Sequence, residues 1–173
     1  MSSVAAFDPE RLLAVLARHD VEFVLVGALA ARLQGFPRLT ADAALTPRDT
    51  RKNLERLASA LRELDARVFT ESVPEGLAFG CTASALGRAA LWNLVTGAGR
   101  VDIIFRPAGI ASYEELRAGA VEFVVHDITL YAASLRDILR SKEAADRPQD
   151  RQDAIILREM LAADDAARDL GTP

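Results

Sequence analysis

The stretch "VEFVLVGALAARLQGFPRLTADAAL", which runs from Val21 to Leu45, decides the fold. Its first part, 21–27, predicts a strand that ends in glycine, because the run is apolar and rich in valine. The next part, "ALAARLQG", predicts a short helix that Gly35 closes. A second strand is expected over 39–46, and it carries a single carboxylate, Asp42. The stretch therefore predicts a strand, a helix and a strand in direct succession.

The flanking sequence extends this pattern in both directions. Asp8 and Pro9 begin a helix before the stretch, and a second helix begins near Pro47 and buries the stripe from Leu54 to Leu64. Further strands are expected at 66–70, 77–83 and 89–96, as a hairpin through Gly97–Gly99 into 100–107, and as a pair within 121–133. Helices are expected from Tyr113 to Ala118, from Ser134 onward and from Asp150 to Leu161. This order predicts an α/β or α+β fold, with a mixed sheet flanked by helices and a helical C-terminal segment.

The length of 173 residues suits one compact domain, and no repeat or linker divides it. We expect a core over 1–132, a helical C-terminal segment of the same domain over 133–165, and a polar tail over 166–173 that frays.

Composition excludes several classes of function. No apolar run reaches the ~20 residues that a membrane span needs, and the N-terminus has no secretory pattern. The lone cysteine, Cys81, rules out an internal disulfide and fits a reducing cytoplasm. With two histidines and one cysteine, a zinc site is disfavoured, so any metal is expected to be magnesium held by oxygen atoms. A net charge of −4 means that nucleic-acid binding would need a local basic patch.

Several residues could carry chemistry, although each has an ordinary structural explanation. Gly27 ends a strand and opens a helix, where backbone N–H groups can face a phosphate, but most such glycines only make a turn. Arg38 and Thr40 precede Asp42 and could hold phosphate oxygens. Asp102 lies in the apolar run "VDIIF", where an acid must find a partner or face a cleft.

Together with "GRVDIIF" and "ASLRDILRSKEAADRPQDRQD", the opening stretch resembles the minimal nucleotidyltransferase family, and within it the AbiEii-type toxins and related bacterial proteins. The resemblance runs from Asp8 to Leu161. It implies a nucleotidyltransferase-like core in which Gly27 and Ala28 match a glycine pair, and Asp42 and Asp102 match the first and third acids of the catalytic pattern. It also implies that Lys142 and Asp150 lie near the nucleotide, with Asp153 as an alternative for this acid.

The resemblance implies Mg²⁺-dependent transfer of a nucleoside monophosphate from an NTP to a hydroxyl. Two acids at positions i and i+2 of a strand face the same side and can hold two metal ions. Here Asp42 is present, but residue 44 is alanine, so Asp42 and Asp102 remain as the metal-binding residues. The chain is then a natural pseudoenzyme, an inactivated variant, or a protein in which another acid such as Asp49 substitutes.

Three functions follow from these observations. The first is an impaired nucleotidyltransferase, with Arg38, Thr40 and Lys142 on the phosphates, tRNA 3′ ends as acceptor and a cognate antitoxin as partner. The second is a catalytically silent module that binds a nucleotide or a partner, which Ala44 favours. The third is an antibiotic-modifying nucleotidyltransferase.

Three residues keep two interpretations. Lys142 could hold the triphosphate or be an exposed lysine at a helix end. Trp92 could be a core residue or stack on a base, and Asn93 could contact ribose or close a turn.

Overall fold

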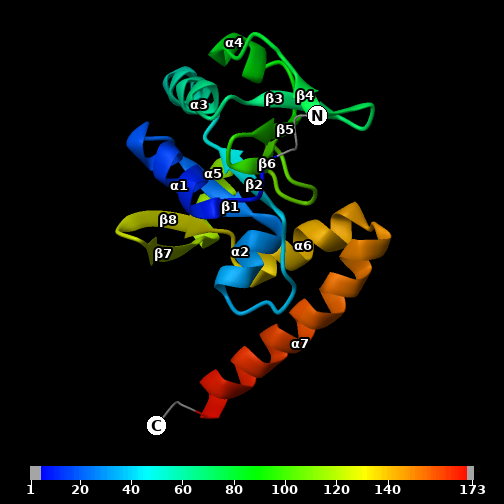
Figure 1. Cartoon of the computed structure of the whole chain (residues 1–173). Coiled ribbons are helices and arrows are strands. Elements are labelled where there is room, and N and C mark those ends of the chain that lie inside the picture. Colours follow the sequence, from blue (N-terminus) through cyan, green and yellow to red (C-terminus); the bar gives the residue numbers. More distant parts are fainter. Residues whose placement is uncertain (1–4, 171–173) are drawn as a thin grey trace.

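The computed structural model describes residues 5–170, and its centre is one mixed sheet of eight strands (Figure 1). The strands are β1 (Phe23–Val26), β2 (Asp42–Pro47), β3 (Arg67–Thr70), β4 (Val73–Leu77), β5 (Leu91–Thr96), β6 (Gly99–Ile104), β7 (Val121–Val125) and β8 (Ile128–Ala132). Their order across the sheet is β4-β3-β5-β6-β2-β1-β8-β7. The pairs β2–β6 and β1–β8 are parallel, and all the others are antiparallel.

Helices cover both faces of this sheet. They are α1 (Pro9–Arg18), α2 (Gly27–Leu33), α3 (Arg51–Glu63), α4 (Ala83–Leu86), α5 (Tyr113–Gly119), α6 (Leu135–Ala145) and α7 (Pro148–Leu170). The last of them, α7, runs along the outside of the molecule, and its C-terminal half projects beyond the sheet (Figure 1). The mixed sheet with flanking helices and a helical C-terminal segment confirms the predicted fold class.

The decisive stretch forms β1, α2 and β2 without an intervening turn between the first two. Gly27 is the first residue of α2 and has φ +68, a left-handed conformation that L side chains rarely adopt. The chain reverses there, and β2 returns antiparallel to β1 with Val26 opposite Ala44. The first strand is shorter than the predicted 21–27 at both ends. Gly27 leaves the sheet to begin the helix, and the N–H groups of Val21 and Glu22 donate to the Leu16 carbonyl and to Asn53 Oδ1 instead of a neighbouring strand.

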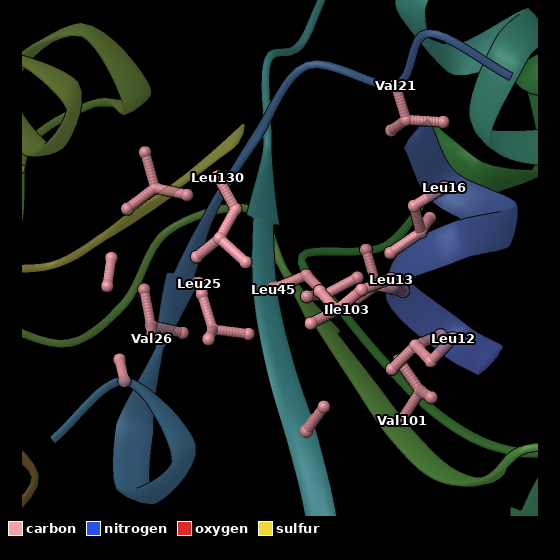
Figure 2. Close-up of a cluster of buried hydrophobic side chains, with 14 of the residues drawn as sticks. Leu12, Leu13, Leu16, Val21, Leu25, Val26, Leu45, Val101, Ile103 and Leu130 are labelled. Atoms are coloured by element: carbon pink, nitrogen blue, oxygen red, sulfur yellow. The ribbon is translucent and has the colours of Figure 1, made fainter. Parts of the chain in front are cut away.

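Alternation along the central strands separates a core face from a cleft face. Leu45 on β2 and Val101 and Ile103 on β6 are buried. Figure 2 shows them beside Leu12, Leu13 and Leu16, the buried side of α1. Because side chains on a strand alternate between faces, Asp42, Ala44 and Asp102 point to the opposite side. The same alternation that forms the core thus directs both acids, each half-buried, to the cleft face.

One predicted strand is wrong. Residues 78–82 form no strand, and the strand that precedes them is β4 at the edge of the sheet. Thr82 caps α4 by accepting a hydrogen bond from the Ala85 N–H at 3.1 Å, so the small residues that follow become helical. Gly76 makes β4 possible, since a Cβ there would lie 2.5 Å from Val95 Cγ2.

The tail also differs from expectation. Helix α7 begins at Pro148 and continues to Leu170, so residues 166–170 are helical where a frayed tail was predicted; 171–173 lie outside the described residues. The segment is rich in alanine, which favours a helix. Arg136 of α6 also donates to both carboxylate oxygens of Asp165, at 2.7 and 2.9 Å. Among the helices of residues 5–170, none has the length and apolar character of a membrane span.

Candidate functional site

A cleft of about 660 Å³ opens on the face of the sheet opposite α1. Its walls come from the β1–α2 junction, the loop before β2, strands β2, β5 and β6, the loop after β6, helix α6 and the start of α7. Nine residues singled out in the sequence line it: Gly27, Ala28, Arg38, Thr40, Asp42, Ala44, Asp102, Lys142 and Asp150. Asp153, the alternative to Asp150, and Asp49 are not among the lining residues. The fold thus brings together residues that lie far apart in the chain.

The register of β2 and β6 fixes how the acids lie. The two strands are parallel, with Asp42 opposite Arg100 and Ala44 opposite Asp102. Asp42 and Asp102 are therefore diagonal neighbours on one face, with Cα atoms roughly 8 Å apart from the standard strand spacings. Carboxylates at this separation can turn toward one cation between them.

Ala44 occupies the middle of this acidic face. It lies between Val26 on β1 and Asp102 on β6, and its Cβ points to the cleft. A Cβ added at Gly27 would lie 3.5 Å from the Ala44 Cβ. Gly27 therefore leaves room beside Ala44, and Asp102 lies on the other side. An aspartate at position 44 would face the same space as Asp42 and Asp102.

Thr40 orients the first acid. Its hydroxyl lies 2.6 Å from Asp42 Oδ1 and donates a hydrogen bond to it. The hydroxyl therefore directs the carboxylate toward the cleft. Thr40 can contact a phosphate only through its lone pairs or by giving up this bond, so its predicted role on the triphosphate stays a prediction.

Asp102 has a pKa above the usual range of an aspartate. Burial and, after it, the negative charge of Asp42 raise its pKa from 3.8 to about 6, although Arg100 and Arg147 oppose the shift. A carboxyl with a raised pKa beside a second acid is typical of a site that binds a cation or handles a proton. The two acids repel each other in the metal-free protein, and a bound cation would relieve this repulsion.

This shift gives a testable pH dependence. The unfolded chain loses the proton near pH 3.8 and the folded chain near pH 6, so the folded state binds more protons across this window and stability falls as the pH rises through it. We expect Asp102→Asn to raise the free energy of unfolding at pH 8 by about 1 to 2 kcal/mol, after allowance for solvent screening, and to have little effect near pH 4. Urea unfolding at the two pH values, without metal, checks this. A variant less stable than wild type at pH 8 would contradict it.

Three cationic side chains and two buried acids form a cluster at one end of the cleft, here called the ionic cluster: Arg38, Lys142, Arg147, Asp150 and Asp153. Lys142 Nζ donates to Asp150 Oδ1 at 3.1 Å and to Asp153 Oδ2 at 2.7 Å. Its side chain is only 13% exposed, so it is not the solvent-exposed helix-end lysine of the alternative interpretation.

The two acids of the ionic cluster accept hydrogen bonds from different arginines. Asp150 Oδ2 accepts from Arg147 Nε at 2.7 Å, and Asp153 Oδ2 accepts from Arg38 Nη2 at 2.7 Å. Burial alone would raise the pKa of Asp150, but the hydrogen bonds from Arg147 and Lys142 outweigh it and lower the pKa. Asp150 therefore remains ionised, and both acids bind cations that line the cleft.

Trp92 and Asn93, the two candidate nucleotide contacts on β5, point to opposite faces of the sheet. Asn93 lies opposite Asp102 in the antiparallel register and lines the cleft. Trp92 points to the other face, where it stacks on Phe79 with ring centroids 5.2 Å apart and donates from its indole N–H to the Leu86 carbonyl. Trp92 is thus a packing residue, and stacking on a base in the cleft is not possible from that face.

The cleft offers few ligands for a metal ion. Carboxylate oxygens suit Mg²⁺, and Asp42 and Asp102 supply them on one face. Within residues 5–170, however, no group of three or more Asp, Glu, His or Cys side chains could hold a metal ion. The set fits one weakly held cation, and the position that would supply the next ligand is Ala44.

A second hollow of about 770 Å³ lies between α3 and α4 and shares no lining residue with the cleft. Its arginines are bound locally: Arg62 donates to the Cys81 carbonyl and to Ser59 Oγ, and Arg51 donates to Glu55. It contains no acids arranged like those of the cleft, so the cleft is the candidate site.

Comparison with known proteins supports the fold. No family model matches the chain, and no curated protein matches it. The crystal structure of ANT(2″)-Ia in complex with adenylyl-2″-tobramycin matches with a TM-score of 0.56 at 19% identity, over 91% of this chain and 89% of that one. TM1012 of Thermotoga maritima, described as a candidate nucleotidyltransferase, matches with a TM-score of 0.50 at 15% identity, over 92% of this chain and 97% of that one. The chain therefore has the nucleotidyltransferase fold.

Proposed function

We propose that this protein binds a nucleoside triphosphate with Mg²⁺ in the cleft, and that its chemistry is the transfer of a nucleoside monophosphate to a hydroxyl, impaired by Ala44. The observation that carries the proposal is the union, in one cleft, of Asp42 and Asp102 with the cations Arg38, Lys142 and Arg147. Acids that hold a metal ion beside cations that hold phosphate oxygens are the parts that phosphoryl transfer requires.

Each side chain has a distinct part in this chemistry. Asp42, oriented by Thr40, and Asp102 hold the cation, which when bound neutralises phosphate charge and lowers the pKa of the attacking hydroxyl. Arg38 and Lys142 contact phosphate oxygens through N–H donors that the ionic cluster leaves unused. Asp102, on the strand next to Asp42, is the carboxylate placed to accept the proton of the attacking hydroxyl.

The acceptor and the biological setting rest on the sequence resemblance alone. It favours a tRNA 3′ end as acceptor, AbiEii-like activity and a cognate antitoxin. A polycationic antibiotic would need several free carboxylates in the cleft. Of the acids that line it, Asp137 binds Arg140, and Asp150 binds Lys142 and Arg147. The apolar residues Leu91, Ile104, Pro107 and Ala108 also line the cleft. The likeness to ANT(2″)-Ia concerns the fold and carries no argument for its substrate.

A silent binding module is the second candidate, and one observation favours it. Ala44 lies directly opposite Asp102, at the place where a second strand acid would face both the cation and the phosphates. A protein that has lost this acid can keep nucleotide binding through the ionic cluster while losing transfer. The two candidates therefore share a nucleotide site and differ in whether it reacts.

Nucleotide binding tests what the two candidates share. We expect Asp42→Asn to weaken Mg²⁺-dependent NTP binding by about 10-fold or more, because the amide keeps the Thr40 hydrogen bond but loses the charge that holds the cation. Calorimetric titration of each NTP, with Mg²⁺ and with EDTA, measures this. Asp49→Asn is the matched control, since Asp49 is exposed and lies outside the cleft. Unchanged binding in Asp42→Asn would remove the metal site from the proposal.

A further inference from the structure

Asp153 is the least exposed charged group of the cleft region, although it is not among the residues that line the cleft. Its side chain is 1% exposed, and it lies on the second turn of α7. A buried carboxylate needs several donors to offset the loss of water. Asp153 has three: Arg38 Nη2 at 2.7 Å, Lys142 Nζ at 2.7 Å and Gln149 Nε2 at 3.3 Å.

The two cations that Asp153 binds come from different parts of the fold. Arg38 belongs to the loop between α2 and β2, and Lys142 belongs to α6. Both line the cleft, and both reach the same oxygen, Oδ2. This single oxygen therefore sets the separation and direction of two groups that share no other hydrogen-bond partner within residues 5–170.

Both cations keep donors for a ligand. The ammonium of Lys142 has three N–H groups, of which two bind Asp150 and Asp153. The guanidinium of Arg38 uses Nη2 on Asp153, and its Nε is buried without a partner among the described residues. The side chain is 40% exposed, and the residue lines the cleft. Asp153 thus fixes one side of each cation and leaves the other side available.

We propose that Asp153 is a positioning residue of the nucleotide site, which holds Arg38 and Lys142 together so that both donate to the β- and γ-phosphates of a bound nucleoside triphosphate. The inference rests on the proposed nucleotide site and makes α7 a part of it. The chain of contacts continues from Arg38 through its loop to Thr40 and so to Asp42, which links the phosphate end of the cleft to the acids.

The direction in which Asp153→Asn changes NTP affinity distinguishes a positioning role from a simple effect of charge. Asp153→Asn removes a negative charge close to the phosphates, so charge alone predicts tighter NTP binding. Positioning predicts the opposite: we expect triphosphate affinity to fall by about 10-fold, because both cations lose their common anchor. Affinity for the matching monophosphate should change by less than about 2-fold, since it lacks the phosphates that these cations contact.

The experiment compares the tightest-binding NTP and its monophosphate, both with Mg²⁺, on wild type, Asp153→Asn and Asp146→Asn. Asp146 is the matched control because it is an exposed acid between the same two helices, paired only with Arg151 among the described residues. A tenfold fall in the triphosphate-to-monophosphate affinity ratio, confined to Asp153→Asn, supports the inference. An equal loss for both ligands shows a merely structural role and overturns it, as does tighter or unchanged triphosphate binding.

Two further results keep the test decisive. If Asp153→Asn does not fold, Arg38→Lys takes its place, because it keeps the charge but lacks the planar fork that reaches Asp153 and a phosphate together. An unchanged affinity ratio in Arg38→Lys would then overturn the inference. If wild type binds none of the four NTPs, the proposed function itself fails, and the inference with it; normal wild-type binding with unaffected variants overturns the inference alone.

Discussion

Replacing Ala44 by aspartate is expected to raise the rate of nucleotidyl transfer by about 100-fold or more, the size of effect seen when one charged or hydrogen-bonding group is added to or removed from a transition state. The new carboxylate would lie opposite Asp102 and two residues from Asp42, on the face where these acids already meet. Three carboxylates instead of two would bind the cation tightly enough to support the reaction.

Labelled NTPs, Mg²⁺ and bulk tRNA provide the assay for this variant. Ala44→Asn is the control, because it has nearly the size of aspartate but no charge. Ala44→Asp combined with Asp102→Asn should fall to the wild-type rate or below it, because it lacks Asp102 as metal ligand and proton acceptor. If wild type and Ala44→Asp label RNA equally, the claim that the second acid is needed is wrong. If neither labels RNA while both bind NTP, the silent module becomes the better description.

Lys142→Ala is expected to lower the free energy of unfolding by about 3 kcal/mol, because it leaves two buried carboxylates short of a partner. The loss should fall at the low end of the range for broken buried pairs, since Arg38 still binds Asp153 and Arg147 still binds Asp150. Urea unfolding at pH 7 measures it. The other lysine, Lys52, is exposed on α3, so Lys52→Ala should change stability by less than about 0.5 kcal/mol.

The result for Lys142 also bears on function. The same substitution removes a donor to the phosphates, so weaker NTP binding must be measured at a temperature where the variant is folded. A variant that unfolds like wild type would show that Lys142 is not needed to hold Asp150 and Asp153 together. The burial of its side chain would then have another cause.

The elements around the cleft were predictable from local patterns. The valine-rich run before Gly27, the alternating run around Asp102 and the Ser134 cap each carry a strong local signal, and the structure places β1, β6 and α6 there. The strand predicted at 77–83 failed because the Thr82 cap and the small residues after it favour a helical turn over an apolar strand. The apolar run before Thr82 masked this local cap, and the packing of α4 against α3 adds a preference that no local pattern reveals.

The candidate site was predictable only in part. Asp42 and Asp102 stood out because an acid in an apolar strand needs an explanation. The anchoring role of Asp153 was hidden, since Asp150 and Asp153 on a polar helix look like an exposed acidic surface until Arg38 and Lys142 reach them. Long-range ion pairs of this kind follow from the relative placement of a loop and two helices, which sequence periodicity does not specify.

The parallel pairing of β2 with β6 has a consequence for how the protein is made. During synthesis, Asp42 leaves the ribosome well before Asp102, and β2 must wait with one unpaired edge until the β5–β6 hairpin has formed. The ionic cluster comes later still, because it needs the start of α7. Contacts so distant in sequence close slowly, so we expect the nucleotide pocket to be the last region to mature. A nascent chain that stalls before residue 148 would hold both acids and lack the anchor for its phosphate-binding cations.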